Sequence, residues 1–211
     1  MSRNLIIWGC GGHGREVSHL CEQIGIEVVG FLDERPHMKG VVVDGVPVLG
    51  DITDILPLRG KVPVFCGGVG DPALKRHFFE KSMDSGFGLA SALIHPGVYL
   101  SKRSHIGPGT MVAEGCILTV NVDVDAHVTL NRSVNLGHDV RIGKFATLSP
   151  GVVVSGNVDV GEGAYLGTGC IIREKIQIGA WSEVGGGAFV AKPVISRTLV
   201  VGVPAAFKKD L

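Results

Sequence analysis

The sequence predicts a small α/β layer followed by a parallel β-helix, and three observations carry this prediction. Every sixth residue from Ile94 to Val190 is aliphatic. A period of six fits neither an amphipathic helix nor an alternating strand, so it indicates a repeat architecture stacked along an axis. The residues before this repeat show strand-like and helical patterns around a glycine-rich turn, which is typical of a βαβ unit.

The N-terminal elements follow from apolar patterning. Residues 5–8 are expected to form a buried strand, residues 15–24 a helix and residues 26–32 a second strand. A further strand at 62–66 and a helix near 71–83 complete the α/β layer. The chain therefore begins with a small Rossmann-like domain.

A glycine-rich turn lies between the first expected strand and helix. Gly9, Gly11 and Gly14 form a Gly-x-Gly-x-x-Gly pattern, and Asp33 follows the second strand. Such a turn presents bare backbone amides and a helix N-terminus to phosphate. A complete NAD-binding fold needs two halves of this kind, and there is room for one, so a nucleotide diphosphate is favoured over NAD. The alternatives are a turn that serves only packing and, for His13, a helix cap instead of a phosphate contact.

The repeat predicts a triangular coil. Each side has six residues, with one aliphatic residue pointing inward and a small or branched residue four places later near the corner. Three sides complete a rung, and adjacent rungs lie about 4.8 Å apart. Residues eighteen apart are therefore expected to stack above one another. Seventeen aliphatic positions, from Ile94 to Val190, predict between five and six coils with two ends to cap.

Composition excludes several classes of protein. Lys plus Arg total 20 and Asp plus Glu total 20, without a basic stripe, which argues against nucleic acid as a partner. Five cysteines without a CxxC pair indicate a reducing cytoplasm. The N-terminus lacks a long apolar segment, so neither a signal peptide nor a membrane partner is expected.

The chemistry predicted from the residues centres on His138. This histidine is third in its six-residue side, near a corner where a side chain can leave the rod. General base catalysis needs a group that titrates near neutral pH, as an imidazole does. Asp139 is placed to orient the ring, provided that the corner bends, because adjacent side chains in a regular strand diverge.

The stacking rule places Gly156 one rung from His138. A glycine lets a ligand approach the backbone closely, and its N–H could stabilise a developing oxyanion. The alternative is a corner glycine chosen for its backbone angles.

These residues together resemble the bacterial sugar acetyltransferases that include sialic acid O-acetyltransferases and bacillosamine or perosamine N-acetyltransferases. The resemblance rests on Gly11-Gly12-His13-Gly14, Phe31 to Glu34, the hexapeptide repeat, Asn131 followed by His138-Asp139, and Gly202 to Ala205. It implies a left-handed β-helix, a homotrimer, acetyl-CoA as co-substrate and a nucleotide sugar held mainly by the N-terminal domain.

The resemblance also implies roles for individual residues. His138 is the base and Asp139 its partner, while the Gly156 amide faces the thioester. Thr168 and Gly186, eighteen apart, match positions whose backbone contacts the pantetheine arm. The remaining matches concern the substrate: Gly11, Gly12, His13 and Gly14 in the loop, Asp33 and Glu34 as nucleotide-contacting acids, and Asn131 near the acceptor amine. For Asn131 the alternative is a corner asparagine that satisfies the backbone, and for the two acids a solvated strand end.

The expected domains are residues 1–88 for nucleotide-sugar binding, 89–198 for the acetyltransferase β-helix and 199–211 as a C-terminal tail. The expected function is acetyl-CoA-dependent N-acetylation of a nucleotide-linked amino-deoxy sugar, in surface polysaccharide or glycan precursor synthesis in the cytoplasm. The alternatives are a sugar or sialic acid O-acetyltransferase and a non-catalytic nucleotide-sugar-binding trimer. No metal is expected, because His95, His105, His127 and His138 offer neither a close pair nor an eighteen-residue spacing for a β-helical carbonic anhydrase.

Overall fold

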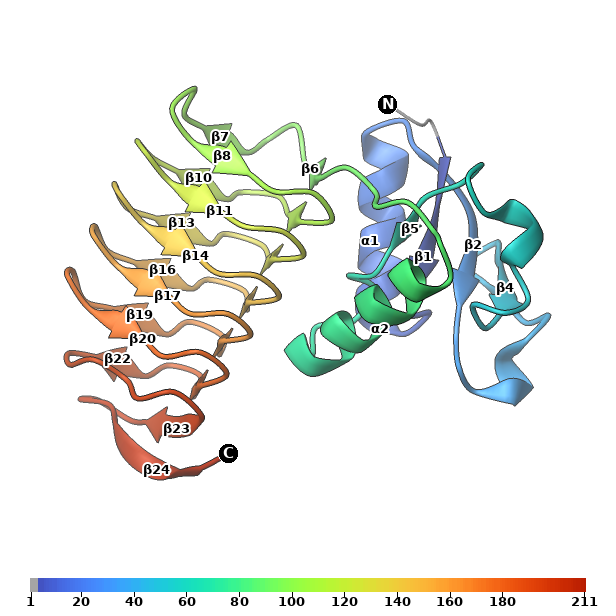
Figure 1. The fold of residues 1–211 in the computed structure, drawn as a ribbon. Helices are drawn as coiled ribbons and strands as arrows, with labels where there is room; N and C mark the ends of the chain where they lie inside the picture. The colour runs from blue at the N-terminus through green and yellow to red at the C-terminus, as the bar shows by residue number, and fades with distance from the viewer. Residues whose placement is uncertain (1–3) are drawn as a thin grey trace.

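The computed structural model describes residues 4–211, which form an N-terminal α/β domain beside a triangular prism of stacked coils (Figure 1). The N-terminal elements are β1 (Asn4–Trp8), α1 (Gly12–Gln23), β2 (Glu27–Leu32), η1 (Pro36–Met38), β3 (Val42–Val43), β4 (Val46–Gly50), η2 (Leu56–Leu58), β5 (Val64–Phe65) and α2 (Pro72–Asp84). The predicted order of strands and helices is therefore confirmed, with β3 and β4 in addition.

The N-terminal sheet has the strand order β3-β4-β2-β1-β5. Strand β1 pairs in parallel with β2 on one side and with β5 on the other. Helix α1, which follows β1, packs on the face of the sheet that carries Ile7, whereas α2, which follows β5, packs on the opposite face, where Phe78 stacks on Trp8. Ligands of open α/β sheets bind at the carboxyl edge, where such connections diverge. The glycine loop after β1 and the loop 67–70 after β5 lie at this edge.

The hairpin of β3 and β4 was not predicted. Its two-residue turn is Asp44-Gly45, and both residues have positive φ, 48° and 82°. An Asp-Gly pair is a strong hairpin signal because it tolerates these angles at low cost. Strand β4 then adds to the parallel sheet beside β2.

The prism consists of seventeen two-residue strands. They are β6 (Leu93–Ile94), β7 (Tyr99–Leu100), β8 (His105–Ile106), β9 (Met111–Val112), β10 (Ile117–Leu118), β11 (Asp123–Val124), β12 (Thr129–Leu130), β13 (Asn135–Leu136), β14 (Arg141–Ile142), β15 (Thr147–Leu148), β16 (Val153–Val154), β17 (Asp159–Val160), β18 (Tyr165–Leu166), β19 (Ile171–Ile172), β20 (Gln177–Ile178), β21 (Glu183–Val184) and β22 (Phe189–Val190). The second residue of each strand is the predicted aliphatic position.

The three sides of the prism are parallel sheets in which every third strand pairs. A six-stranded sheet runs from β7 to β22, a five-stranded sheet from β8 to β20, and an eight-stranded sheet contains β6 to β21. Partners are eighteen residues apart, as in the pairing of Leu118 with Leu136 and of Leu136 with Val154. The inward aliphatic residues form one continuous core from Val112 to Val190, and the stacking rule is confirmed.

The chain ends in two further strands, β23 (Thr198–Val201) and β24 (Ala206–Asp210). Strand β23 extends the eight-stranded sheet next to β21, and β24 returns antiparallel to it. The last residues thus close the lower end of the prism in Figure 1 as a hairpin. The domain limits at 88 and 198 stay predictions.

Two observations describe the chain as a whole. All five cysteines are buried free thiols. Among residues 4–211, no helix has the length and apolar character needed to cross a bilayer.

Candidate active site

His138 and Asp139 form a hydrogen-bonded pair at the corner between β13 and β14. His138 Nδ1 lies 2.9 Å from Asp139 Oδ2. Adjacent side chains of a regular strand would diverge, but Asp139 has a φ of 58°, in the left-handed region. This sharp bend is what turns the carboxylate back toward the imidazole.

Two asparagines on neighbouring rungs flank the pair. Asn121 Nδ2 donates to Asp139 Oδ1 at 3.0 Å, and Asn157 Nδ2 lies 3.4 Å from His138 Nδ1. The Asn121 amide, followed by His138, lowers the pKa of Asp139, so the carboxylate stays ionised. An ionised carboxylate accepts a hydrogen bond from the Nδ1–H of His138, which leaves Nε2 of the ring to act as acceptor. The sequence analysis missed both asparagines, although each lies eighteen residues from Asp139.

Gly156 lies directly against the imidazole of His138. A Cβ atom at Gly156 would overlap Nε2 and Cε1 of the ring. The Gly156 N–H has no hydrogen-bond acceptor within residues 4–211. A bare peptide donor and a ring nitrogen thus share one exposed corner, which is the arrangement that acyl transfer requires.

A second group of predicted residues lines a cavity of about 890 Å³ between the N-terminal domain and the prism. Its wall includes His13, Asn131 and Thr168. Gly186 stacks on Thr168, since its Cβ position lies 3.2 Å from the Thr168 carbonyl oxygen. Asn131 Oδ1 accepts from the Arg132 N–H at 2.8 Å, in agreement with the alternative in which this asparagine satisfies the backbone at a corner. Asn131 also borders the cavity.

The glycine loop divides into packing glycines and open glycines. The Cβ position of Gly9 lies 2.6 Å from the Gly68 carbonyl oxygen, and a Cβ at Gly14 would overlap the Gly9 carbonyl. Around the Cβ positions of Gly11 and Gly12 there is no atom within 4 Å. Packing therefore explains Gly9 and Gly14 but not Gly11 and Gly12, which leave the start of α1 open.

The N-terminus of α1 is available to an anion. Its N-cap, Gly11, supplies no side-chain hydrogen bond, and the first turn has no acidic residue. In α2, by contrast, the Asp71 side chain accepts from the Leu74 N–H. Unpaired amides at a helix N-terminus favour phosphate.

His13 lies on the cavity wall with one free ring nitrogen. Its Nδ1 is 3.5 Å from Glu16 Oε2, while Nε2 is buried without a partner among the described residues. Burial lowers the pKa of His13, which favours the neutral ring. With its proton directed to Glu16, the neutral ring keeps Nε2 as an acceptor that has no partner among the described residues.

Asp33 and Glu34 are engaged by other side chains. Asp33 accepts from Arg35 Nε at 2.8 Å and Nη2 at 2.7 Å, and from Cys10 Sγ at 2.9 Å. The Arg35 hydrogen bonds hold the pKa of Asp33 at about 2. Glu34 pairs with Lys81 and with His77. The expected direct contact of these carboxylates with a nucleotide stays a prediction.

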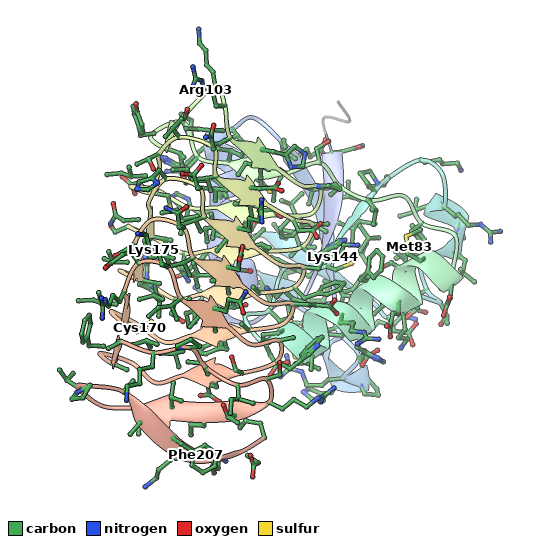
Figure 2. All side chains as sticks on the ribbon, turned by 60° about the vertical axis from the view of Figure 1, so that its left-hand side comes forward. Met83, Arg103, Lys144, Cys170, Lys175 and Phe207 are labelled. Atoms are coloured by element: carbon green, nitrogen blue, oxygen red, sulfur yellow. The ribbon has the colours of Figure 1, made fainter. Side chains whose placement is uncertain are left out.

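The two groups of site residues occupy different corners of the prism. His138, Asp139 and Gly156 lie where the six-stranded sheet meets the five-stranded sheet, whereas Asn131 and Thr168 lie where it meets the eight-stranded sheet. One six-residue side, up to about 20 Å of extended chain, separates these corners. Figure 2 shows Lys175, from the His138 corner, on the side of the prism away from α2. A single chain does not join the two groups.

Another hollow, of about 1080 Å³, covers the outer face of the five-stranded sheet. Its wall holds a ladder of polar side chains, including His105 paired with Asp123 at 3.2 Å. None of the predicted site residues borders it, and no group of three metal-ligating side chains occurs within residues 4–211.

The fold and the corner site define a left-handed β-helix acyltransferase with a Rossmann-like N-terminal domain. A family model for the PglD N-terminal domain matches residues 4–82. No curated protein sequence matches significantly. Several solved structures match over nearly the whole chain.

One similar structure is PerB from Caulobacter crescentus in complex with CoA and GDP-perosamine, at 31% identity and a TM-score of 0.89, with 97% of each chain covered. The acetyltransferase domain of PglB from Neisseria gonorrhoeae, in complex with acetyl coenzyme A, has 29% identity and a TM-score of 0.87, covering 99% of this chain and 100% of that one. WeeI from Acinetobacter baumannii has 25% identity and a TM-score of 0.87, covering 97% and 100%. The chain belongs to the hexapeptide-repeat family of acetyl-CoA-dependent sugar acetyltransferases.

Proposed function

We propose that the protein transfers the acetyl group of acetyl-CoA to the amino group of a nucleotide-linked amino-deoxy sugar. The observation that carries this proposal is that the His138 imidazole, held by Asp139, lies against Gly156, whose N–H has no hydrogen-bond acceptor among residues 4–211. PerB, which is 31% identical, binds GDP-perosamine, a sugar of this class.

The proposed chemistry is direct attack of the sugar amine on the thioester. The C–N bond forms while His138 Nε2 takes the proton that the amine loses, and Asp139 stabilises the resulting imidazolium. The Gly156 N–H donates to the oxyanion of the tetrahedral intermediate, which then expels CoA as a thiolate that takes up a proton.

The substrates have separate surfaces in this proposal. The open Gly11-Gly12 amides at the start of α1 receive the diphosphate, and His13 and Asn131 face the sugar from the wall of the cavity. The backbone edge formed by Thr168 and Gly186 borders the pantetheine arm. Asp33 accepts hydrogen bonds from Nε and Nη2 of Arg35 and so holds the guanidinium beside the glycine loop.

A homotrimer joins the two corners of the site. The six-stranded sheet that lies between these corners has a mostly apolar outer face, on which Asn135 is the polar member. Its exposed apolar residues are Tyr99, Ile117, Val153 and Ile171, which are 64, 42, 36 and 44% exposed. Exposed apolar area of this extent favours association. When three prisms turn this face toward a shared three-fold axis, the His138 corner of one chain meets the Asn131 and Thr168 corner of the next.

The proposed location is the cytoplasm, and the proposed pathway is surface polysaccharide or glycan precursor synthesis. Five buried free thiols are typical of a reducing compartment. One similar structure is named a perosamine N-acetyltransferase, which supports an amine over a hydroxyl as acceptor.

The proposal is tested by measuring CoA release from acetyl-CoA against a panel of acceptors. The panel contains GDP-perosamine, dTDP-4-amino-4,6-dideoxyglucose, a UDP-linked 4-amino sugar and free sialic acid. We expect release with at least one nucleotide amino sugar and an amide in the product. Release with sialic acid alone would make the enzyme an O-acetyltransferase, and binding of nucleotide sugars without release would favour the non-catalytic trimer.

A further inference from the structure

Lys75 is a fully buried lysine in the contact between α2 and the prism. Its Nζ atom lies 2.8 Å from Thr147 Oγ1, 2.9 Å from the Ala146 carbonyl oxygen and 3.2 Å from Thr129 Oγ1. Thr129 and Thr147 are stacked partners on β12 and β15. The lysine of one domain is thus hydrogen-bonded to two successive rungs of the other.

Thr147 links Lys75 to the loop 67–70, which follows β5. Its hydroxyl accepts from Lys75 and donates to the Gly70 carbonyl oxygen at 2.7 Å. Gly70 directly precedes Asp71, the N-cap of α2, and both residues line the cavity of the candidate site. The relay from Lys75 through Thr147 therefore holds one wall of the cavity against the prism.

Stability of the fold does not account for a lysine at this place. Burial lowers the pKa of Lys75 well below its usual value, and among residues 4–211 no carboxylate contacts Nζ. Replacing a buried charged group by an apolar side chain of similar volume is often neutral or stabilising. An apolar side chain at residue 75 would fill the contact between α2 and the prism equally well. It could not donate a hydrogen bond to Thr147, however, and so could not fix the orientation of the Thr147 hydroxyl.

We infer that Lys75 and Thr147 are positioning residues that set the distance between the loop 67–70 and the prism, and with it the depth at which the sugar enters the cavity. This inference rests on the proposed function. Neither side chain needs to touch the reacting atoms. Their role is to orient the Gly70 carbonyl and the start of α2 opposite the open end of α1.

The test compares Thr147→Val, Thr147→Ser and Lys75→Met. Valine keeps the shape but removes both hydrogen bonds of the relay, serine keeps the hydroxyl, and methionine keeps the volume of Lys75 without a donor. Thr198→Val is the matched control, because the buried Thr198 hydroxyl also donates to a loop carbonyl, that of Ile195, at 2.7 Å, and neither residue lines the cavity. Each protein is assayed with the acceptors of the panel above, and the dissociation constant of each nucleotide amino sugar is measured by calorimetry.

We expect Thr147→Val and Lys75→Met to raise KM and Kd for the nucleotide amino sugar about tenfold, the equivalent of one lost hydrogen bond. KM for acetyl-CoA should stay within about twofold, and Lys75→Met should keep or raise the melting temperature. Thr147→Ser should restore wild-type values, and Thr198→Val should lower stability without changing KM.

Equal increases in both KM values, or values for Thr147→Val and Lys75→Met that match the wild type, would overturn the inference. Wild-type protein that binds nucleotide amino sugars but releases no CoA would overturn the proposed function alone, because Kd then still reports on the relay. Wild-type protein that neither binds nor acetylates any member of the panel would overturn both.

Discussion

The imidazole of His138 lies against the peptide of Gly156, one rung away, so closely that a Cβ atom at residue 156 would overlap the ring. We therefore expect Gly156→Ala to displace the imidazole and to lower kcat by about 10² to 10³, the range for a lost oxyanion donor or base. The melting temperature should change little, because the corner is exposed and Gly156 does not have a positive φ. Steady-state kinetics with thermal unfolding would check this, and an alanine variant with wild-type kcat would contradict the contact's importance.

The glycine loop offers two substitutions with opposite outcomes. Gly11→Ala adds a methyl group where no atom lies within 4 Å, so the fold should keep its melting temperature while Kd for the nucleotide sugar rises about tenfold or more. Gly14→Ala places a methyl group on the Gly9 carbonyl and should lower the free energy of unfolding by about 1 to 3 kcal/mol. Calorimetry and urea unfolding measure the two effects. If Gly11→Ala weakens the fold and leaves binding intact, the loop serves only packing.

Acid should destabilise the protein through His127. This imidazole lies between Phe79 and Phe145, at ring-centroid distances of 4.7 and 5.4 Å, and neither nitrogen has a partner among the described residues. Burial, together with the charge of Lys75, lowers the pKa of His127 to about 4. Because the unfolded chain takes up a proton at higher pH, the stabilisation is fully present above about pH 6.5 and is lost as the pH falls toward 4.

The size of this effect follows from the pKa difference. The free energy of unfolding should fall by up to about 3 kcal/mol between pH 7 and pH 4 on account of His127. In His127→Phe, which copies the residue stacked one rung away at Phe145, this part of the pH dependence should disappear. Urea unfolding at several pH values measures both proteins, and identical slopes would contradict the assignment.

The apolar face of the six-stranded sheet should hold the trimer together. In the double variant Ile117→Lys with Ile171→Lys, three copies of each charge would meet at the proposed axis, so the protein should become monomeric and lose activity. Ile195→Lys is the control, because Ile195 is 77% exposed but lies outside this face. Light scattering after gel filtration gives the mass. A double variant that stays trimeric would place the interface elsewhere.

The sequence was most informative where structure follows a strict period. The aliphatic residue at every sixth position predicted all seventeen strands of the prism, and the eighteen-residue rule predicted that His138 and Gly156 meet. The same rule, applied to Asp139, would have found Asn121 and Asn157. The Asp44-Gly45 hairpin was also readable, since that dipeptide is a turn signal in its own right.

Other features depend on contacts that a linear pattern does not contain. Arg35 folds back onto Asp33 and occupies the carboxylate expected to meet a nucleotide. Nothing in the sequence around Lys75 distinguishes it from an exposed lysine of a helix, and only the packing of α2 on the prism makes it fully buried. The separation of Asn131 from His138 on two corners follows from the side length, but in the proposed function a second chain brings the two corners together, and the period of six does not encode that contact.

The central claim is that His138 accepts the proton of a sugar amine, and the direct measurement is kcat of His138→Ala against wild type. With the nucleotide amino sugar that the wild type acetylates, kcat should fall by about 10² to 10⁴ while KM for acetyl-CoA stays the same. Asp139→Asn should show a smaller loss in the same direction. A folded, trimeric His138→Ala enzyme with wild-type kcat would contradict the account.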